Sequence, residues 1–175
     1  GLGGRTTNLD SPGLPGRNGL KYLPVALLQA APLDLVILAL GTNDPFAAAG
    51  RKPRDTVNAM RSLIQVTKNL PTVQGSFVQN TSPPKVMIVA PPNCLPLSSV
   101  TGEGFPELDE LTRWLPELAQ LYGELAIEQN TYFADSAQLC EPDPVDGLHL
   151  DVENTRKLGV GIAKTLALEA FADRS

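Results

Sequence analysis

Apolar residues along this chain form two kinds of pattern, short continuous runs and longer stretches with helical spacing. Continuous runs of the length and β-branched content typical of strands buried on both faces occupy residues 35–40 and 86–90, with a shorter one at 131–134. Helical spacing is found at residues 18–31, 53–70, 108–125 and 152–171. Because the two patterns alternate, the sequence predicts an α/β fold, a parallel sheet with helices on both faces.

Proline and glycine mark where these elements should end. Residues 1–16 are rich in Gly, Pro, Asn and Asp and are predicted to form a loop. Pro116 lies inside the helical pattern of residues 108–125, so we expect that helix to be kinked or split in two. The loops that follow the three strands should share the carboxyl edge of the sheet, where open α/β sheets bind ligands.

Composition and charge exclude several classes of partner. The chain has 175 residues, 42% hydrophobic and 19% charged, which suits one packed domain. The net charge is −5 and no basic run is longer than Arg51-Lys52, which argues against nucleic acid or an anionic membrane as the partner. No apolar stretch approaches the roughly 20 residues of a membrane helix. The acidic balance and the few cysteines favour a cytoplasmic location.

Cys94 and Cys140 are too few for a disulfide framework, and their spacing matches no zinc pattern. We interpret them as two small apolar thiols. The chain has one histidine, with neither cysteines nor paired carboxylates beside it, so no metal site and no cofactor is implied.

The first candidate for chemistry is the segment Gly41-Thr42-Asn43-Asp44, directly after the apolar run 35–40. An asparagine at the carboxyl end of a strand can aim its side-chain N–H at a reacting carbonyl oxygen, as an oxyanion-hole donor does. The alternative is that Asn43 and Asp44 only cap a turn or a helix.

The second candidate is Asp146-Gly147-Leu148-His149, which contains the only histidine of the chain. An imidazole is suited to act as the general base that activates a serine hydroxyl near neutral pH. Asp146 could accept the proton of the other ring nitrogen and so fix the tautomer. The alternatives are a structural histidine and an aspartate that caps the helix that follows.

The third candidate is the glycine cluster at Gly1 to Gly4. It matches neither the dinucleotide fingerprint nor the P-loop, because no Gly-Lys-Ser/Thr follows. It is either a simple turn, a backbone oxyanion donor, or the phosphate cradle of a nucleotide-binding α/β domain, and the last would require a strand directly before Gly1.

Together, Gly1-Leu2-Gly3-Gly4-Arg5-Thr6-Thr7, Gly41-Thr42-Asn43-Asp44 and Asp146-Gly147-Leu148-His149 resemble three of the four sequence blocks of the SGNH (GDSL-like) hydrolase family. The resemblance extends over the whole chain and is greatest to the bacterial arylesterases and acyltransferases. It implies a single domain over residues 1–175 with a flavodoxin-like, three-layer α/β/α sandwich around a parallel sheet. It also implies a serine esterase that hydrolyses small carboxylic esters through an acyl-enzyme, or transfers the acyl group to an alcohol.

The resemblance also implies residue roles. Gly4 would supply the backbone N–H of the oxyanion hole and Asn43 its side-chain donor. His149 would be the general base, and Asp146 would orient it. Asp44 would support the loop rather than the chemistry.

The fourth block of the family, Gly-Asp-Ser with the nucleophile, is not found, because no serine of the chain follows Gly-Asp. We therefore expect an N-terminal segment, either a cleaved fragment or residues outside the given sequence, that carries Gly-Asp-Ser and the first two strands. Three short parallel strands with an open interior edge are an improbable free-standing sheet, and we expect strands 35–40 and 86–90 to be poorly covered. The alternative is a non-catalytic binding relative that has lost its serine.

Two long loops, at residues 72–84 and 91–106, are further features of the sequence. Residues 92–94 leave a strand at the ligand-binding edge, so they either line the acyl pocket or form a surface connection. Such loops are also candidates for contacts between copies of the chain in a homo-oligomer.

Overall fold

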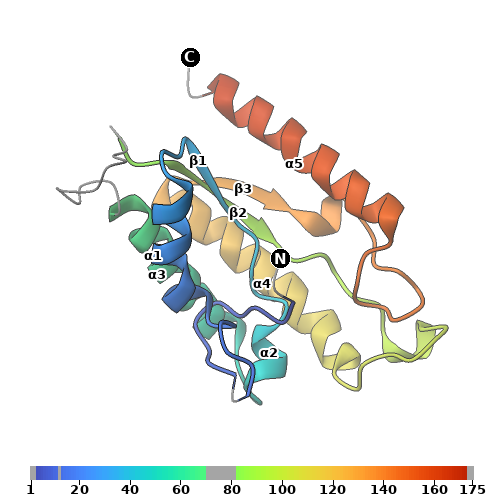
Figure 1. The fold of residues 1–175 in the computed structure, drawn as a ribbon. Helices are drawn as coiled ribbons and strands as arrows, with labels where there is room; N and C mark the ends of the chain where they lie inside the picture. Colours follow the sequence, from blue (N-terminus) through green and yellow to red (C-terminus); the bar gives the residue numbers. More distant parts are fainter. Residues whose placement is uncertain (1–2, 12, 70–81, 173–175) are drawn as a thin grey trace.

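The computed structural model describes residues 3–11, 13–69 and 82–172 (Figure 1). The four helices and three strands predicted from the sequence follow one another in the expected order, and the short helices α2, η2 and η3 are additional. They are α1 (Gly19–Ala30), β1 (Leu35–Leu38), α2 (Asp44–Ala47), α3 (Pro53–Asn69), β2 (Lys85–Ala90), η2 (Leu97–Ser99), α4 (Leu108–Gln129), β3 (Tyr132–Asp135), η3 (Ser136–Gln138) and α5 (Val152–Ala172).

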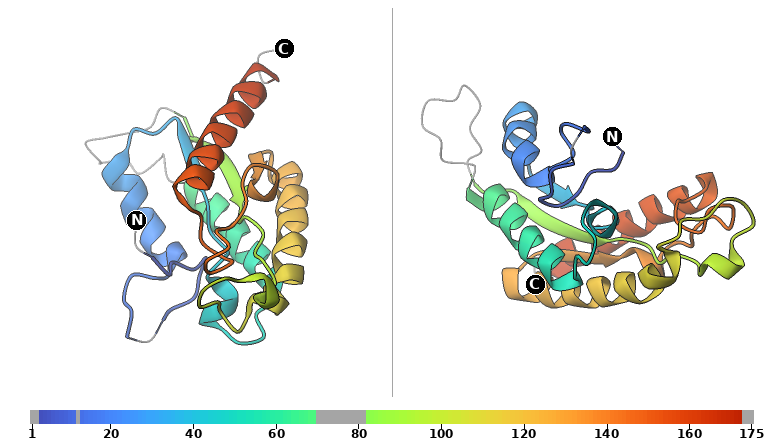
Figure 2. Two further views of the ribbon diagram at one scale, coloured as in Figure 1. Left: turned by 90° about the vertical axis from the view of Figure 1, so that its right-hand side faces the viewer. Right: turned by 90° about the horizontal axis from the view of Figure 1, so that it is seen from below.

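The three strands form one parallel sheet in the order β1-β2-β3. Val36 pairs with Val86, and Ile88 pairs with Phe133. One face of the sheet packs on α3 and α4 around Met60, while the other packs on Ile162 and Leu166 of α5. Figure 2 shows α4 and α5 on opposite sides of the sheet. The prediction of a parallel α/β fold with helices on both faces is confirmed.

The two longer strands differ in burial, which corrects two expectations. Residues 86–90 of β2 are all buried, because β2 is the central strand and both helical layers meet on it. The expected poor coverage of β2 is therefore wrong. In β1, Leu38 is buried, but Ile37 is 44% exposed. β1 is an edge strand within the described part of the chain, so the prediction of burial on both faces is wrong for β1.

Helix α4 continues past Pro116 as one helix, so the expectation of a split is wrong. Pro116 lies on the exposed side of α4, where its ring displaces no core side chain. Leu115 and Leu118 beside it are fully buried and anchor the helix to the sheet. The helix ends at Asn130, which adopts the left-handed conformation with φ 48°.

The remaining expectations about the chain surface and its thiols have simple outcomes. Cys94 and Cys140 are free and buried, and burial raises the pKa of both thiols. The loop expected at residues 72–84 lies mostly outside the described residues. Of the helices described, none combines the length and apolar content that crossing a bilayer requires.

Candidate active site

The sequence motifs around Asn43 and His149 follow β1 and β3, and the parallel sheet brings both to its carboxyl edge. Asn43 directly precedes α2, and His149 lies in the loop between η3 and α5. In Figure 1, α2 and the loop before α5 lie toward the same end of the sheet. The fold therefore groups the candidates that are more than 100 residues apart in the chain.

Asp146 and His149 are joined by direct hydrogen bonding. The Nδ1 atom of His149 lies 2.7 Å from Oδ2 of Asp146. The other carboxylate oxygen accepts the backbone N–H groups of Leu148 and His149, each at 2.9 Å. Partial burial alone would raise the pKa of Asp146, but these N–H groups and the imidazole outweigh it and hold the pKa below its usual value. Asp146 is thus an ionised acceptor beside a ring that is 70% exposed.

Asp146 does not cap the helix that follows. That position belongs to Asp151, whose Oδ1 accepts the backbone N–H of Asn154 at 2.6 Å near the start of α5. The capping alternative for Asp146 is therefore wrong.

The loop that carries His149 is fixed by its neighbours. Gly147 has φ +74°, and a Cβ there would lie 2.7 Å from Val100, so only glycine suits the turn. The Gly147 carbonyl accepts the N–H of Leu95 at 2.8 Å, and the His149 carbonyl accepts that of Asp143 at 2.7 Å. Residues 91–106 therefore support the histidine loop. Within them Cys94 is buried in the core, so it belongs to the packing of the domain.

Asn43 connects two of the predicted motifs. Its Nδ2 donates to the Arg5 carbonyl at 3.1 Å, and it makes no capping bond to α2 although it holds the N-cap position. The capping alternative is thus wrong for the Asn43 side chain. A side-chain amide has two N–H groups, so the second is available to a ligand. Gly4, the residue before Arg5, is exposed with φ +73°, and its N–H bonds to none of the described residues.

Asp44 is fully buried, and its side chain links the segment that contains Asn43 to the segment that contains Thr7. Its carboxylate accepts the Thr7 N–H at 2.8 Å, the Thr7 hydroxyl at 2.5 Å and the Thr56 hydroxyl at 2.9 Å. Arg51 completes the cluster with an Nη2 contact of 3.3 Å. Asp44 therefore fixes the backbone of both loops. Sequence reasoning missed Arg51 and Thr56, because no local pattern marks a partner that lies just before or within the next helix.

An aromatic contact joins the Asn43 loop to the histidine loop. The rings of Phe46 and Phe105 lie edge to face with centroids 5.8 Å apart, and Phe105 makes a similar contact with His149 at 5.9 Å. Phe46 belongs to α2, which Asn43 precedes. Both phenylalanines were missed at the sequence level, where a single aromatic residue in a loop or a one-turn helix gives no signal.

The chemistry available here is that of hydrogen-bond donors, a carboxylate and an imidazole. In the described ranges 3–11, 13–69 and 82–172, no group of three or more His, Cys, Asp or Glu side chains is placed to hold a metal ion.

Comparison with known proteins now identifies the family. The GDSL-like Lipase/Acylhydrolase family matches residues 1–154. The chain belongs to this family. A carbohydrate acetylesterase from Sinorhizobium meliloti is 33% identical, with a TM-score of 0.78 over 94% of this chain and 74% of that one. The inhibitor-bound aryl esterase of M. smegmatis is 35% identical, with a TM-score of 0.80 over 94% of this chain and 74% of its own.

A GDSL-like lipase from Bacteroides thetaiotaomicron shares the fold at 15% identity, with a TM-score of 0.60 over 95% of this chain and 73% of that one. No curated protein sequence matches the chain. The resemblance to SGNH hydrolases noted in the sequence is therefore confirmed, and so is the three-layer α/β fold that it implied.

Proposed function

We propose that this SGNH hydrolase is a serine esterase that cleaves small carboxylic esters through an acyl-enzyme. The observation that carries the proposal is the 2.7 Å contact between His149 and Asp146, which holds an exposed imidazole at the ligand-binding edge of the sheet. The two similar structures named above are an aryl esterase and a carbohydrate acetylesterase, which supports the same class of reaction.

Each step of the reaction uses a group at this edge. Because Nδ1 of His149 faces Asp146, Nε2 is the ring nitrogen that takes the proton of the serine hydroxyl. The serine oxygen then bonds to the ester carbonyl, and the N–H groups of Gly4 and Asn43 stabilise the oxyanion that forms. Collapse of this tetrahedral intermediate breaks the bond between the acyl carbon and the alcohol oxygen. The alcohol leaves with the proton from Nε2, and the acyl group stays on the serine. Water then attacks the acyl-enzyme in the same way, with His149 taking its proton, and the carboxylic acid is released from the serine.

We assign the serine to a Gly-Asp-Ser that lies outside residues 1–175. The eight serines of the chain include none preceded by Gly-Asp, and the two similar structures contain residues beyond the 74% that this chain matches. The exposed edge of β1 supports the same view, because a strand beside it would end at Asn43 and Gly4.

The test uses the protein recovered from its source organism through an affinity tag at the C-terminus of this chain. We expect hydrolysis of p-nitrophenyl acetate, its loss in the His149→Ala variant, and loss after treatment with a serine-reactive phosphonate. Mass mapping of the phosphonate should locate the serine in Gly-Asp-Ser.

Two results would contradict the proposal. The absence of both ester hydrolysis and phosphonate labelling would indicate the non-catalytic relative. An active, folded species of 18.6 kDa alone would exclude a nucleophile outside residues 1–175.

A further inference from the structure

Both oxyanion donors of the proposed mechanism depend on the position of one loop, residues 4–8, which we call the donor loop. Asn43 donates its Nδ2 to the Arg5 carbonyl at 3.1 Å, so the direction of its second N–H depends on where that carbonyl lies. Gly4 directly precedes Arg5 in the same loop. A shift of the donor loop therefore moves both donors at once.

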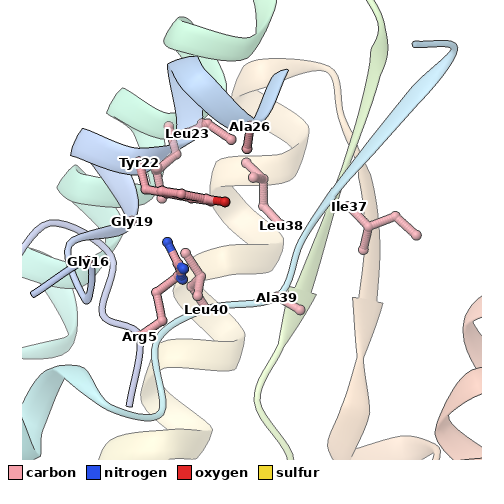
Figure 3. A pocket seen from close by; sticks show the side chains of 11 residues that line it. Arg5, Gly16, Gly19, Tyr22, Leu23, Ala26, Ile37, Leu38, Ala39 and Leu40 are labelled. Carbon is pink, nitrogen blue, oxygen red and sulfur yellow. The ribbon is translucent and has the colours of Figure 1, made fainter. Parts of the chain in front are cut away.

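Helix α1 holds the donor loop through two kinds of contact. The Arg5 guanidinium lies 4.2 Å from the centre of the Tyr22 ring, and Figure 3 shows it beside that ring. The Gly19 N–H donates to the Thr6 carbonyl at 3.1 Å. These contacts join the donor loop to α1, whereas a second set joins it to the segment that contains Asn43.

Arg51 supplies this second set together with Asp44. Its Nη2 atom donates to Oδ1 of Asn8 at 2.8 Å, and it lies 3.3 Å from Oδ2 of Asp44, the residue after Asn43. The same nitrogen lies 3.5 Å from the Thr7 hydroxyl oxygen. One guanidinium thus contacts both the donor loop and the segment that contains Asn43.

The main chain of Arg51 is anchored to α4. The indole Nε1 of Trp114 donates to the Arg51 carbonyl at 2.9 Å. The Tyr122 hydroxyl, also on α4, donates to the Leu40 carbonyl at 3.1 Å, just before the Asn43 segment begins. The Arg51 side chain is only 12% exposed. Helix α4 is therefore a common base for Arg51 and the Asn43 segment, and the guanidinium reaches from this base to the donor loop.

We propose that Arg51 is a positioning residue for the oxyanion hole, which sets the separation of the Gly4 and Asn43 donors through its contacts with Asn8 and Asp44. This inference rests on the proposed function. A donor stabilises the oxyanion only at about 2.7–3.1 Å from it, so a small shift of the donor loop lowers the rate. A planar guanidinium contacts several acceptors at fixed angles, which an ammonium group does not do.

The first measurement is the steady-state hydrolysis of p-nitrophenyl acetate by the native, tagged protein. In Arg51→Met we expect kcat to fall about 100-fold with KM unchanged, because the lost interaction is made in the transition state and misplacement costs about this factor. Arg51→Lys keeps the charge and loses the planar fork, so its kcat should fall about tenfold. Arg54→Met, at an exposed arginine of α3, is the matched control and should keep the parental kcat.

The second measurement is inhibition by a trifluoromethyl ketone. The serine oxygen adds to its carbonyl carbon, the serine proton passes to His149, and the carbonyl oxygen becomes an oxyanion. The inhibition constant should rise in each Arg51 variant by the factor by which kcat falls. Ile64→Val, at a fully buried residue of α3, lowers the Tm and should change neither value.

Three results would overturn the positioning role. One is a parental kcat in folded Arg51→Met or Arg51→Lys, with folding checked by circular dichroism. Another is an unchanged inhibition constant while kcat falls, because the loss would then arise outside the oxyanion hole. The third is an equal loss of kcat in Ile64→Val, which would show an effect of stability alone. Arg51→Lys carries the same comparison if Arg51→Met does not fold.

Failure of the esterase and failure of the positioning role are distinguishable. Hydrolysis by the parent with no effect of the Arg51 variants would keep the esterase and remove the positioning role. Without hydrolysis by the parent, heteronuclear NMR of the native protein follows the side-chain N–H signals of Asn43, assigned with Asn43→Ala. Arg51→Lys should shift these signals if Arg51 positions the loop, and parental signals would overturn that role.

Discussion

His149 donates its backbone N–H to the same Asp146 carboxylate that its ring contacts, so one aspartate holds both the main chain and the imidazole of the histidine. The two residues are three positions apart, and Gly147 supplies the positive φ that closes the turn. This arrangement needs no partner from elsewhere in the fold. It restricts the imidazole to the tautomer with the proton on Nδ1.

The first prediction concerns Asp146→Asn in the native, tagged protein. An amide cannot stabilise the imidazolium, and it favours the other tautomer of His149. We expect kcat for p-nitrophenyl acetate to fall by three to four orders of magnitude, about the scale of this change in other triads. Asp143→Asn in the same loop is the control, because Asp143 contacts the Val145 N–H and not the ring. Equal losses in both variants would show that only the loop was disturbed.

The second prediction concerns Phe105 as a positioning residue for His149. Phe105→Leu keeps an apolar side chain and removes the ring that packs edge to face on the imidazole. An aromatic contact of about 1 kcal/mol corresponds to about a fivefold decrease in kcat. Phe133→Leu in β3 is the control, and a kcat as low as that of Phe105→Leu would contradict the prediction.

The third prediction concerns the buried cluster around Asp44. Asp44→Asn leaves Arg51 buried without its charged partner and weakens the acceptor of the Thr7 and Thr56 hydroxyls. We expect the free energy of unfolding, measured by urea denaturation, to fall by about 3–5 kcal/mol. Asp55→Asn removes an exposed carboxylate that accepts the Lys52 N–H, and should cost about 1 kcal/mol or less. A smaller loss at Asp44 than at Asp55 would refute this role.

The fourth prediction compares two glycines in helices. A Cβ at Gly19 would lie 2.6 Å from the Thr6 carbonyl oxygen, so Gly19→Ala must push α1 away from the loop before Arg17. We expect a loss of about 1–3 kcal/mol and a lower Tm. Gly159→Ala in α5 meets nothing within 4 Å and should raise stability by about 1 kcal/mol. Thermal denaturation of both variants provides the measurement, and a Tm for Gly19→Ala at or above the parent value would contradict the close approach.

Much of the site could be predicted because its chemistry is local in the chain. The Asp146–His149 spacing, Asn43 after an apolar run and the glycines near Gly4 are visible as motifs, and the roles assigned to them remain predictions. Phe105, Arg51 and Thr56 were not predictable. Each acts through a residue of another element or loop, and nothing in its own neighbourhood marks the contact.

The order of the elements, the parallel sheet and the grouping of motifs at its carboxyl edge were determined by the sequence alone, because periodicity and chain direction specify them. Only the tertiary structure decided that β2 is covered on both faces while β1 has an open edge among the described residues, that α4 continues through Pro116, and that the Arg5 guanidinium stacks on Tyr22. These features depend on which surfaces meet. A linear pattern records the polarity of each residue, but it does not record which residue lies opposite.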